Sequence, residues 1–209
     1  MEKKKKTIKS KMLLSTLLLI PIITILLIVL FRHILLPTNE DILNYVKNIK
    51  EYSTGVEYIF KNSRVEIKEL TTQYYSDNKG LRIEFGQDNK TIKVYNSGEI
   101  QVKDYQGDEF KLDGNMDIIY PLASINNILS NKMLGEIKEN VKEWGDGNYL
   151  EVDLKYDMNN KHFEKGKFYI DKKTKSPILL KIFDINGIER VIITYKDFKV
   201  EKNLSDELF

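Results

Sequence analysis

The sequence predicts an α+β, mainly β fold: a curved, unclosed antiparallel β-sheet (a half-barrel) covered by helices and preceded by one N-terminal transmembrane helix. Three observations lead to this prediction. Residues 12–31 form an uncharged apolar run, and apolar and charged residues alternate with a period of two through much of 52–198. One segment of helical period precedes that alternation at 38–51, and a second interrupts it at 116–134. A sheet of about ten short antiparallel strands has to curl, so helices can cover its apolar concave face.

The uncharged run is the first element of the chain. It extends from Met12 to Phe31 and contains Leu19, Pro21 and Ile28. About twenty residues rising about 1.5 Å each match a hydrocarbon core of roughly 30 Å. The run is longer than the apolar region of a signal peptide and no small-residue cleavage pattern follows it, so we expect an uncleaved membrane anchor. Pro21 falls in mid-span, where membrane helices tolerate a kink.

A basic segment precedes the anchor and sets its expected orientation. Lysines favour the cytoplasmic side, so the chain after Arg32 should be exported and held in the cell membrane by a single span. The predicted divisions are a cytoplasmic basic tail at 1–11, a transmembrane anchor at 12–36 and an extracytoplasmic domain at 38–209. The topology-determining lysines are Lys3, Lys4, Lys5, Lys6, Lys9 and Lys11.

Charge and composition exclude several classes of protein. The chain of 209 residues has a net charge of +2, but seven of its 33 basic groups and one of its 31 acidic groups precede residue 33. The remainder has 26 basic and 30 acidic groups, a net charge of −4, without the basic stripe of a nucleic-acid-binding protein. The absence of cysteine excludes disulfides, thiol catalysis and lipidation on a cysteine.

The exported domain should begin with a short amphipathic helix at 38–51. Ile42, Tyr45, Val46 and Ile49 fall on one apolar stripe, and Thr38 is a plausible N-cap. The other face carries both signs of charge, so we expect this helix to cover the core rather than to lie on the membrane.

About six antiparallel strands should follow in a meander, apolar on one face and charged on the other. Turn signals at 77–80, 86–90 and 106–108 separate them, and Asn96-Ser97-Gly98 is typical of a tight hairpin. The charged residues alternate with apolar ones along these strands, which indicates a solvated outer face.

A second helical region is expected at 116–134, where apolar residues follow a period of 3.6. Pro121 should start or kink this helix, and Gly135 should end it. Strands then resume from Leu150, and Ile185-Asn186-Gly187 predicts a further hairpin before the C-terminal tail.

The sequence contains no constellation typical of catalysis. Neither a zinc-protease motif, a nucleophile elbow nor a phosphate-binding glycine loop occurs. His33 abuts the anchor, and His162 lies in a polar loop with Asp157 and Glu164 nearby in sequence. The stretch 184–187 departs from the spacing of a calcium loop, so we interpret it as a turn. We therefore expect a protein that is not an enzyme and that uses no cofactor or metal.

Aromatic residues are numerous, with twelve Tyr, nine Phe and one Trp. Two interpretations remain open. The rings could fill the space under a wide, curved sheet, or some of them could line a cavity or a partner groove.

Three segments of the C-terminal third form a series. Residues 176–187 are a strand with an Asp-x-x-Gly hairpin, 191–198 are a returning strand, and 203–209 are a tail of the form Asn…Asp…Leu-Phe. This series resembles the end of the LolA/LolB lipoprotein-carrier superfamily, and the opening helix followed by 49–53 is similar to its start. The resemblance implies an unclosed, strongly curved antiparallel sheet wrapped around helices.

Within that superfamily the chain resembles the clostridial spore germination proteins of the GerS type. This resemblance implies a membrane-anchored, non-catalytic protein that partners a CwlD-type cortex N-acetylmuramoyl-L-alanine amidase in forming muramic-δ-lactam. The location implied is outside the cell membrane, with the forespore intermembrane space as one candidate. The best-known GerS is a lipoprotein, whereas this chain has no cysteine to lipidate, so a spanning helix would replace the lipid as the anchor.

Two other hypotheses remain. One is a lipid- or lipoprotein-binding protein that uses the concave face of the sheet. The other is a small hydrolase centred on His162. The sequence names no partner-binding residues, although an exposed strand edge would be a candidate for pairing in a homodimer.

Overall fold

The computed structural model describes residues 17, 19–29, 31, 37–62, 64–86, 90–139, 148–157 and 160–209. These residues belong to two compact units, Met1–Asp41 and Ile42–Phe209.

The predicted anchor falls in the first unit. Leu19, Pro21, Ile28 and Phe31 lie in helical backbone with exposed side chains. Within the described part of the chain, no helix has both the length and the apolar character to cross a membrane. Outside the described residues lie Met12, Lys3, Lys4, Lys5, Lys6, Lys9 and Lys11, so the anchor and its topology stay predictions.

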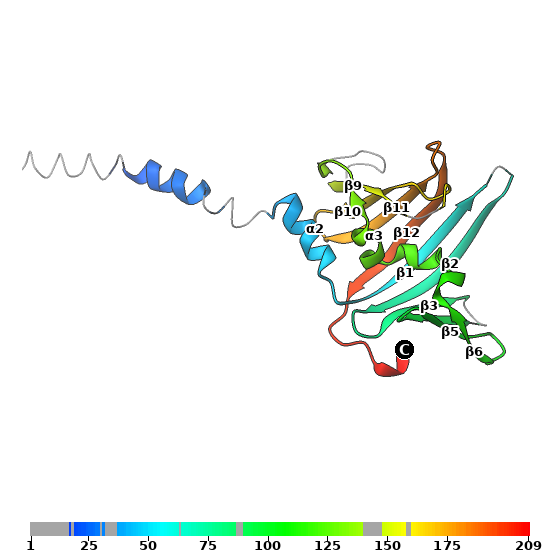
Figure 1. The fold of residues 1–209 in the computed structure, drawn as a ribbon. Helices are drawn as coiled ribbons and strands as arrows, with labels where there is room; N and C mark the ends of the chain where they lie inside the picture. The colour runs from blue at the N-terminus through cyan, green and yellow to red at the C-terminus, as the bar shows by residue number, and fades with distance from the viewer. Residues whose placement is uncertain are drawn as a thin grey trace, which may run out of the picture. The chain divides into compact units, whose positions relative to one another are not determined.

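One 12-stranded antiparallel sheet makes up most of the second unit. Its strands follow the order β6-β5-β4-β3-β2-β1-β12-β11-β10-β9-β7, and β8 also pairs with β9. The sheet is strongly curved and does not close (Figure 1), which confirms the predicted half-barrel. The strands are β1 (Glu51–Lys61), β2 (Glu66–Ser76), β3 (Gly80–Phe85), β4 (Thr91–Asn96), β5 (Glu99–Lys103), β6 (Glu109–Asp113), β7 (Lys132–Met133), β8 (Lys138–Glu139), β9 (Tyr149–Lys155), β10 (Lys165–Asp171), β11 (Ser176–Phe183) and β12 (Glu189–Val200).

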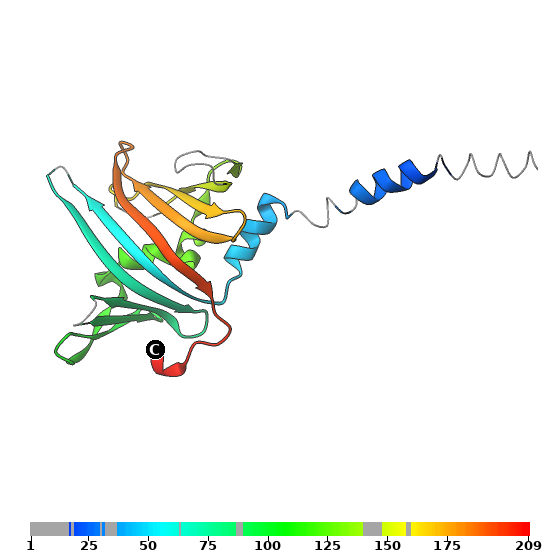
Figure 2. The same cartoon turned by 180° about the vertical axis from the view of Figure 1, so that it is seen from behind.

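The first and last long strands of this unit meet in the middle of the sheet. β1 pairs with β12 from Tyr52 opposite Val200 to Phe60 opposite Val191. On one side of this pair β2 to β6 form a meander, and on the other side β11 to β9 form a second one (Figure 2). The predicted alternation therefore builds two hairpin series that are joined by a contact between distant parts of the chain.

The opening helix is α2 (Asn39–Lys47), which is shorter than the predicted 38–51. The Thr38 hydroxyl accepts from the Asp41 amide at 3.1 Å and the Asp41 carboxylate accepts from the Thr38 amide at 2.9 Å, so the capping box forms with Asp in place of Glu. Ile42, Val46 and Ile49 are buried against the core, as expected, whereas Tyr45 of the predicted stripe is 45% exposed. The helix ends early because β1 begins at Glu51 and pairs with its neighbours from its first residues.

The second helical region is broken into short pieces. It consists of two 3₁₀ turns, η1 (Gly114–Met116) and η2 (Tyr120–Ala123), and the helix α3 (Ile125–Ser130). The prediction of one helix over 116–134 ending at Gly135 is wrong. Pro121 is the second residue of η2, and the chain leaves the helix α3 at Asn131 to pair with β9 as β7. Gly135 has a φ of 73° and lies between β7 and β8.

The tight hairpins predicted at 96–98 and 185–187 are confirmed, whereas the turn signal at 86–90 falls partly on residues outside the described chain. Ser97 and Gly98 both have positive φ, 50° and 83°, and join β4 to β5 in a two-residue hairpin. At the second hairpin, the Asp184 carboxylate accepts from the amides of Asn186 and Ile188, each at 2.9 Å. Asp184 therefore stabilises a turn, as interpreted from its spacing.

Candidate functional site

The concave face of the sheet is the first surface on which a ligand could be expected. The segment from η2 to α3 lies across this face (Figure 1). Its buried side chains are Leu122, Ala123, Ile125, Ile128 and Leu129, which pack into one core with the inward residues of the strands. The chain's own segment therefore occupies this part of the hollow of the half-barrel.

Tyrosine hydroxyl groups fix this segment to the sheet. Tyr58 on β1 donates to the Tyr120 carbonyl at 2.9 Å, and Tyr195 on β12 donates to the Ala123 carbonyl at 2.6 Å. The Tyr52 hydroxyl accepts from the Ile125 amide at 3.3 Å. Burial raises the pKa of Tyr52 to about 12, so the phenol stays neutral in the core.

Further contacts hold the rim of the same segment. Lys93 and Tyr95, both on β4, donate to one oxygen of Asp117 at 2.6 and 2.8 Å. The Lys93 ammonium also lies 5.1 Å from the centre of the Phe85 ring and 5.2 Å from that of Tyr120. The connection between η1 and η2 is thus tied to β4 by an ion pair and a phenol, and the Lys93 ammonium also packs against one ring of β3 and one of η2.

These contacts favour the filling role among the two interpretations of the aromatic residues. Tyr52, Tyr58 and Phe168 are fully buried, and their rings touch neighbouring rings rather than open space. Of the interior polar side-chain atoms, Gln73 Oε1, Asn126 Oδ1 and the Tyr156 hydroxyl have no hydrogen-bond partner among the described residues. Unpaired polar atoms inside a packed core are the usual sites of structural water.

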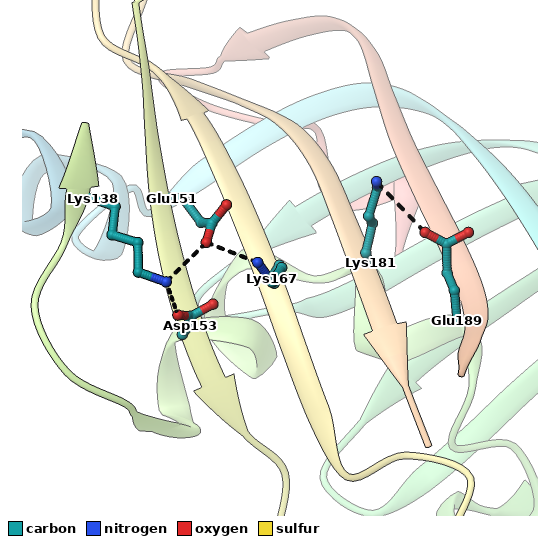
Figure 3. Close-up of polar contacts among 6 residues, drawn as sticks. All are labelled: Lys138, Glu151, Asp153, Lys167, Lys181 and Glu189. Carbon is teal, nitrogen blue, oxygen red and sulfur yellow. Dashed lines mark hydrogen bonds and ion pairs between the residues drawn. The ribbon is translucent and has the colours of Figure 1, made fainter. Parts of the chain in front are cut away.

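The convex face between β8 and β12 carries a ladder of charged side chains (Figure 3). Glu151 on β9 accepts from Lys138 on β8 at 3.2 Å and from Lys167 on β10 at 3.1 Å. Lys138 also donates to Asp153. Further along the ladder, Lys181 lies 3.6 Å from Glu189.

Glu151 is the buried member of this ladder, since its side chain is 3% exposed. Burial alone would raise the pKa of its carboxyl group. Hydrogen bonds from Lys167, Tyr169 and Lys138 outweigh burial and hold the pKa of Glu151 below its ordinary value. A carboxylate fixed in its charged form between two ammonium groups links β8, β9 and β10, and it is not poised for proton transfer at neutral pH.

The C-terminal tail lies on the convex face of the other half of the sheet (Figure 2). Lys79 donates to the Leu204 carbonyl at 2.7 Å, and Arg82 on β3 donates to the Leu208 carbonyl at 2.5 Å. An open hollow of about 460 Å³ lies between the tail and β6. Its lining includes Arg82, Val94, Lys103, Phe110, Lys111 and Phe209.

The residues considered for catalysis do not converge. His162 lies in an exposed turn, where its amide donates to Asn160 at 3.0 Å. Glu164 lies 3.9 Å from Lys155. Among the described residues, no three His, Cys, Asp or Glu side chains are placed to hold a metal ion. His33 lies outside the described residues.

Sequence reasoning did not single out Glu151 or Asp117. The alternation around Glu151 is the same as on solvated strands, and its cover comes from Lys167 and Tyr169 on the neighbouring strand. Asp117 lies between two 3₁₀ turns, and its partners are on β4, more than twenty positions away. No local signal could have revealed either residue.

Comparisons with known proteins add the following. Residues 9–209 match the family described as sporulation protein YdcC-like. No curated protein is similar enough in sequence to count as a match. An uncharacterized conserved protein from Thermus thermophilus aligns with a TM-score of 0.51 and 13% identity over 81% of this chain and 91% of that chain, a likeness that shows the fold.

Two further solved structures are similar at lower scores. A chain in the structure of the CwlD amidase from Clostridioides difficile in complex with the GerS lipoprotein aligns at 22% identity, with a TM-score of 0.47, over 78% of this chain and 93% of that chain. A LolA superfamily protein from Nitrosomonas europaea aligns at 11% identity, with a TM-score of 0.45, over 82% and 97%.

Proposed function

The chain belongs to the YdcC-like family of sporulation proteins, and from this premise we propose that it is a non-catalytic binding protein of the sporulating cell envelope, tethered to the membrane by residues 12–31. The partner that we propose is a cortex N-acetylmuramoyl-L-alanine amidase of the CwlD type, which forms muramic-δ-lactam. The resemblance of residues 176–209 to GerS-type proteins motivates this partner. The function of the chain would be to bind and support the amidase at the membrane surface.

The observation that carries the binding role is the filled concave face. Ala123, Ile125 and Ile128 are fully buried where an acyl chain would have to lie in a carrier. Removing this segment from the hollow would break the hydrogen bonds of Tyr58 and Tyr195 and expose apolar surface. This arrangement favours recognition of a partner by the outer surfaces of the domain over enclosure of a lipid.

The partner can be tested by co-purification of the full chain. The chain, with its own N-terminal segment and a tag, is produced together with a CwlD-type amidase and solubilised in mild detergent. We expect the amidase to co-elute with the chain. The control carries residues 1–37 on an unrelated exported domain, which should not retain the amidase.

A deletion strain gives the second readout. Cortex isolated from its spores should lack muramic-δ-lactam while the remaining peptidoglycan is unchanged. Absence of co-elution combined with normal lactam content would refute the proposed partnership. Mass spectrometry of lipid extracts from the same purified chain addresses the carrier alternative, and we expect no stoichiometric acyl lipid.

A further inference from the structure

The two edges of the sheet differ. At the β9 edge the chain pairs as two short pieces, β7 and β8, interrupted at Gly135, where the chain has a φ of 73°. At the opposite edge β6 is regular over five residues, and no other strand of the described chain pairs with its outer side. Interruption protects natural sheet edges from pairing, so the regular edge is the one open to a further strand.

The backbone groups that face outward on β6 can be identified. The Asp104 amide donates to the Asp108 carbonyl at 3.0 Å, and the Gly114 amide donates to the Gly98 carbonyl at 2.8 Å. Between these two bonds, hydrogen-bonded and non-hydrogen-bonded pairs alternate along the β5–β6 ladder. The amides and carbonyls of Glu109, Lys111 and Asp113 therefore point away from β5 and are free to pair.

The side chains of β6 are arranged to match a second copy of the same strand. We propose that β6 pairs antiparallel with β6 of a second copy of this chain, with Phe110 of each copy at the twofold axis. In this register Glu109 of each copy lies opposite Lys111 of the other, so two pairs of opposite charge form on the convex face. The two Phe110 rings meet on the concave face, where each is 47% exposed in the single chain.

Charge distinguishes this register from its neighbours. Placing Lys111 at the axis would set Lys111 against itself and Glu109 against Asp113, so every charged pair would repel. Placing Leu112 at the axis would set Lys111 of each copy opposite Asp113 of the other. The Asp113 carboxylate, however, already accepts from the Asn115 amide at 2.8 Å and caps η1. Shifting by a single residue would oppose outward-facing and inward-facing backbone groups and make no ladder.

The existing ion pairs of β5 extend the pattern. Glu109 binds Lys103 at 2.9 Å, and Lys111 binds Glu99 at 2.9 Å, all on the convex face. Across the joined edge the charges would alternate from Lys103 to Glu109, then to Lys111 and Glu99 of the second copy. An edge of five residues buries little surface, so this dimer is weak and reversible in the absence of a covalent trap.

A cysteine scan tests the register. The chain has no cysteine, so any disulfide-linked dimer must come from an introduced one. Residues opposite each other at a non-hydrogen-bonded pair have Cα atoms about 4.5 Å apart, within the range that a disulfide spans. Full chains that carry Phe110→Cys, Lys111→Cys, Leu112→Cys or, at the opposite edge, Met133→Cys are oxidised mildly in membranes and separated without reductant.

We expect the dimer yield to be several-fold higher for Phe110→Cys than for the other three variants. A maximum at position 111 or 112 would overturn the proposal, and so would a yield at position 110 no higher than that of Met133→Cys.

A charge-exchange experiment tests the proposal in a second way. Glu109→Lys and Lys111→Glu are each combined with Phe110→Cys on chains with tags of different size. Each variant alone places like charges opposite each other, whereas a mixture restores opposite charges at both pairs. We expect mixed dimers to exceed both homodimers by several-fold. Mixed dimers and homodimers in the proportions of random pairing would overturn the proposal. Such a result would mean that residues 109 and 111 do not lie opposite each other in the dimer.

Discussion

At the scale of single residues, buried tyrosines decide what the concave face can accept. The Tyr58 hydroxyl donates to the Tyr120 carbonyl and accepts from the side-chain amide of Gln73 (Nε2) at 2.5 Å, so it links β1, β2 and η2. Burial raises the pKa of Tyr58 well above its ordinary value, which keeps it a neutral donor. The sequence cannot distinguish such a tyrosine from one that lines a cavity, because both occupy inward positions of a strand.

Replacing Tyr58 by Phe should destabilise the domain by about 1–3 kcal/mol, because the Tyr120 carbonyl and the Gln73 amide lose their buried partner. The free energy of unfolding is measured by urea titration of the full chain in detergent. Tyr105→Phe is the control, since this side chain is 62% exposed, and it should change stability by less than about 0.5 kcal/mol. Equal losses in the two variants would show that the buried hydroxyl has no special role.

Glu151 leads to a prediction about pH. Its pKa is lower in the folded chain than its ordinary value of 4.5, so the unfolded chain binds this proton more tightly. The resulting stabilisation is complete above that value and is lost as the pH falls through the lower folded pKa. Glu151→Gln should therefore reduce the steepness with which the free energy of unfolding falls below a pH of about 4.5.

The measurement is a series of urea titrations at decreasing pH. Glu136→Gln, which removes an exposed acid from the same part of the chain, should keep the steepness of the unchanged protein. If the free energy of unfolding of Glu151→Gln depends on pH in the same way as that of Glu136→Gln, groups other than Glu151 cause the loss of stability in acid.

At the scale of elements, strands and tight turns were predictable because their signals are local. Alternation with a period of two marks β1, β3 and β9, and glycine at positive φ marks the hairpins after Asn96 and Asn186. The pieces β7 and β8 have two residues each, and their pairing depends on β9 rather than on their own sequence. The same dependence explains why a periodic pattern over 116–134 did not give one helix.

Gly114, at the start of η1, offers a test at this scale. A Cβ atom there would lie 2.7 Å from the Gly98 carbonyl oxygen, so η1 would have to move away from the β4–β5 turn. Gly114→Ala should lower the free energy of unfolding by about 1–3 kcal/mol, the range for overpacking. Gly55→Ala on β1 is the control, because its Cβ would have only ordinary contacts at 3.6 Å. If Gly114→Ala lowers the free energy of unfolding no more than Gly55→Ala does, the β4–β5 turn and η1 can move apart without measurable cost.

At the scale of the whole molecule, the half-barrel followed from composition and period, whereas the candidate site did not. Strand number and alternation predict a curled sheet with helices over one face, and the structure has both. Whether that face is hollow or filled depends on side chains from β1, β4, β12 and α3 meeting across the chain. The regular outer edge of β6 likewise becomes visible only when the strand order is known.

The pairing of β1 with β12 at the centre of the sheet also governs when the domain can fold. Thr54 donates a hydrogen bond to the Lys196 carbonyl across 142 positions of sequence, so this contact forms only after almost the whole chain has been synthesised. Until then β1 has an open edge in what will become the middle of the sheet. Such high contact order slows folding. The nascent domain is therefore open to chaperones and proteases until its last strand arrives.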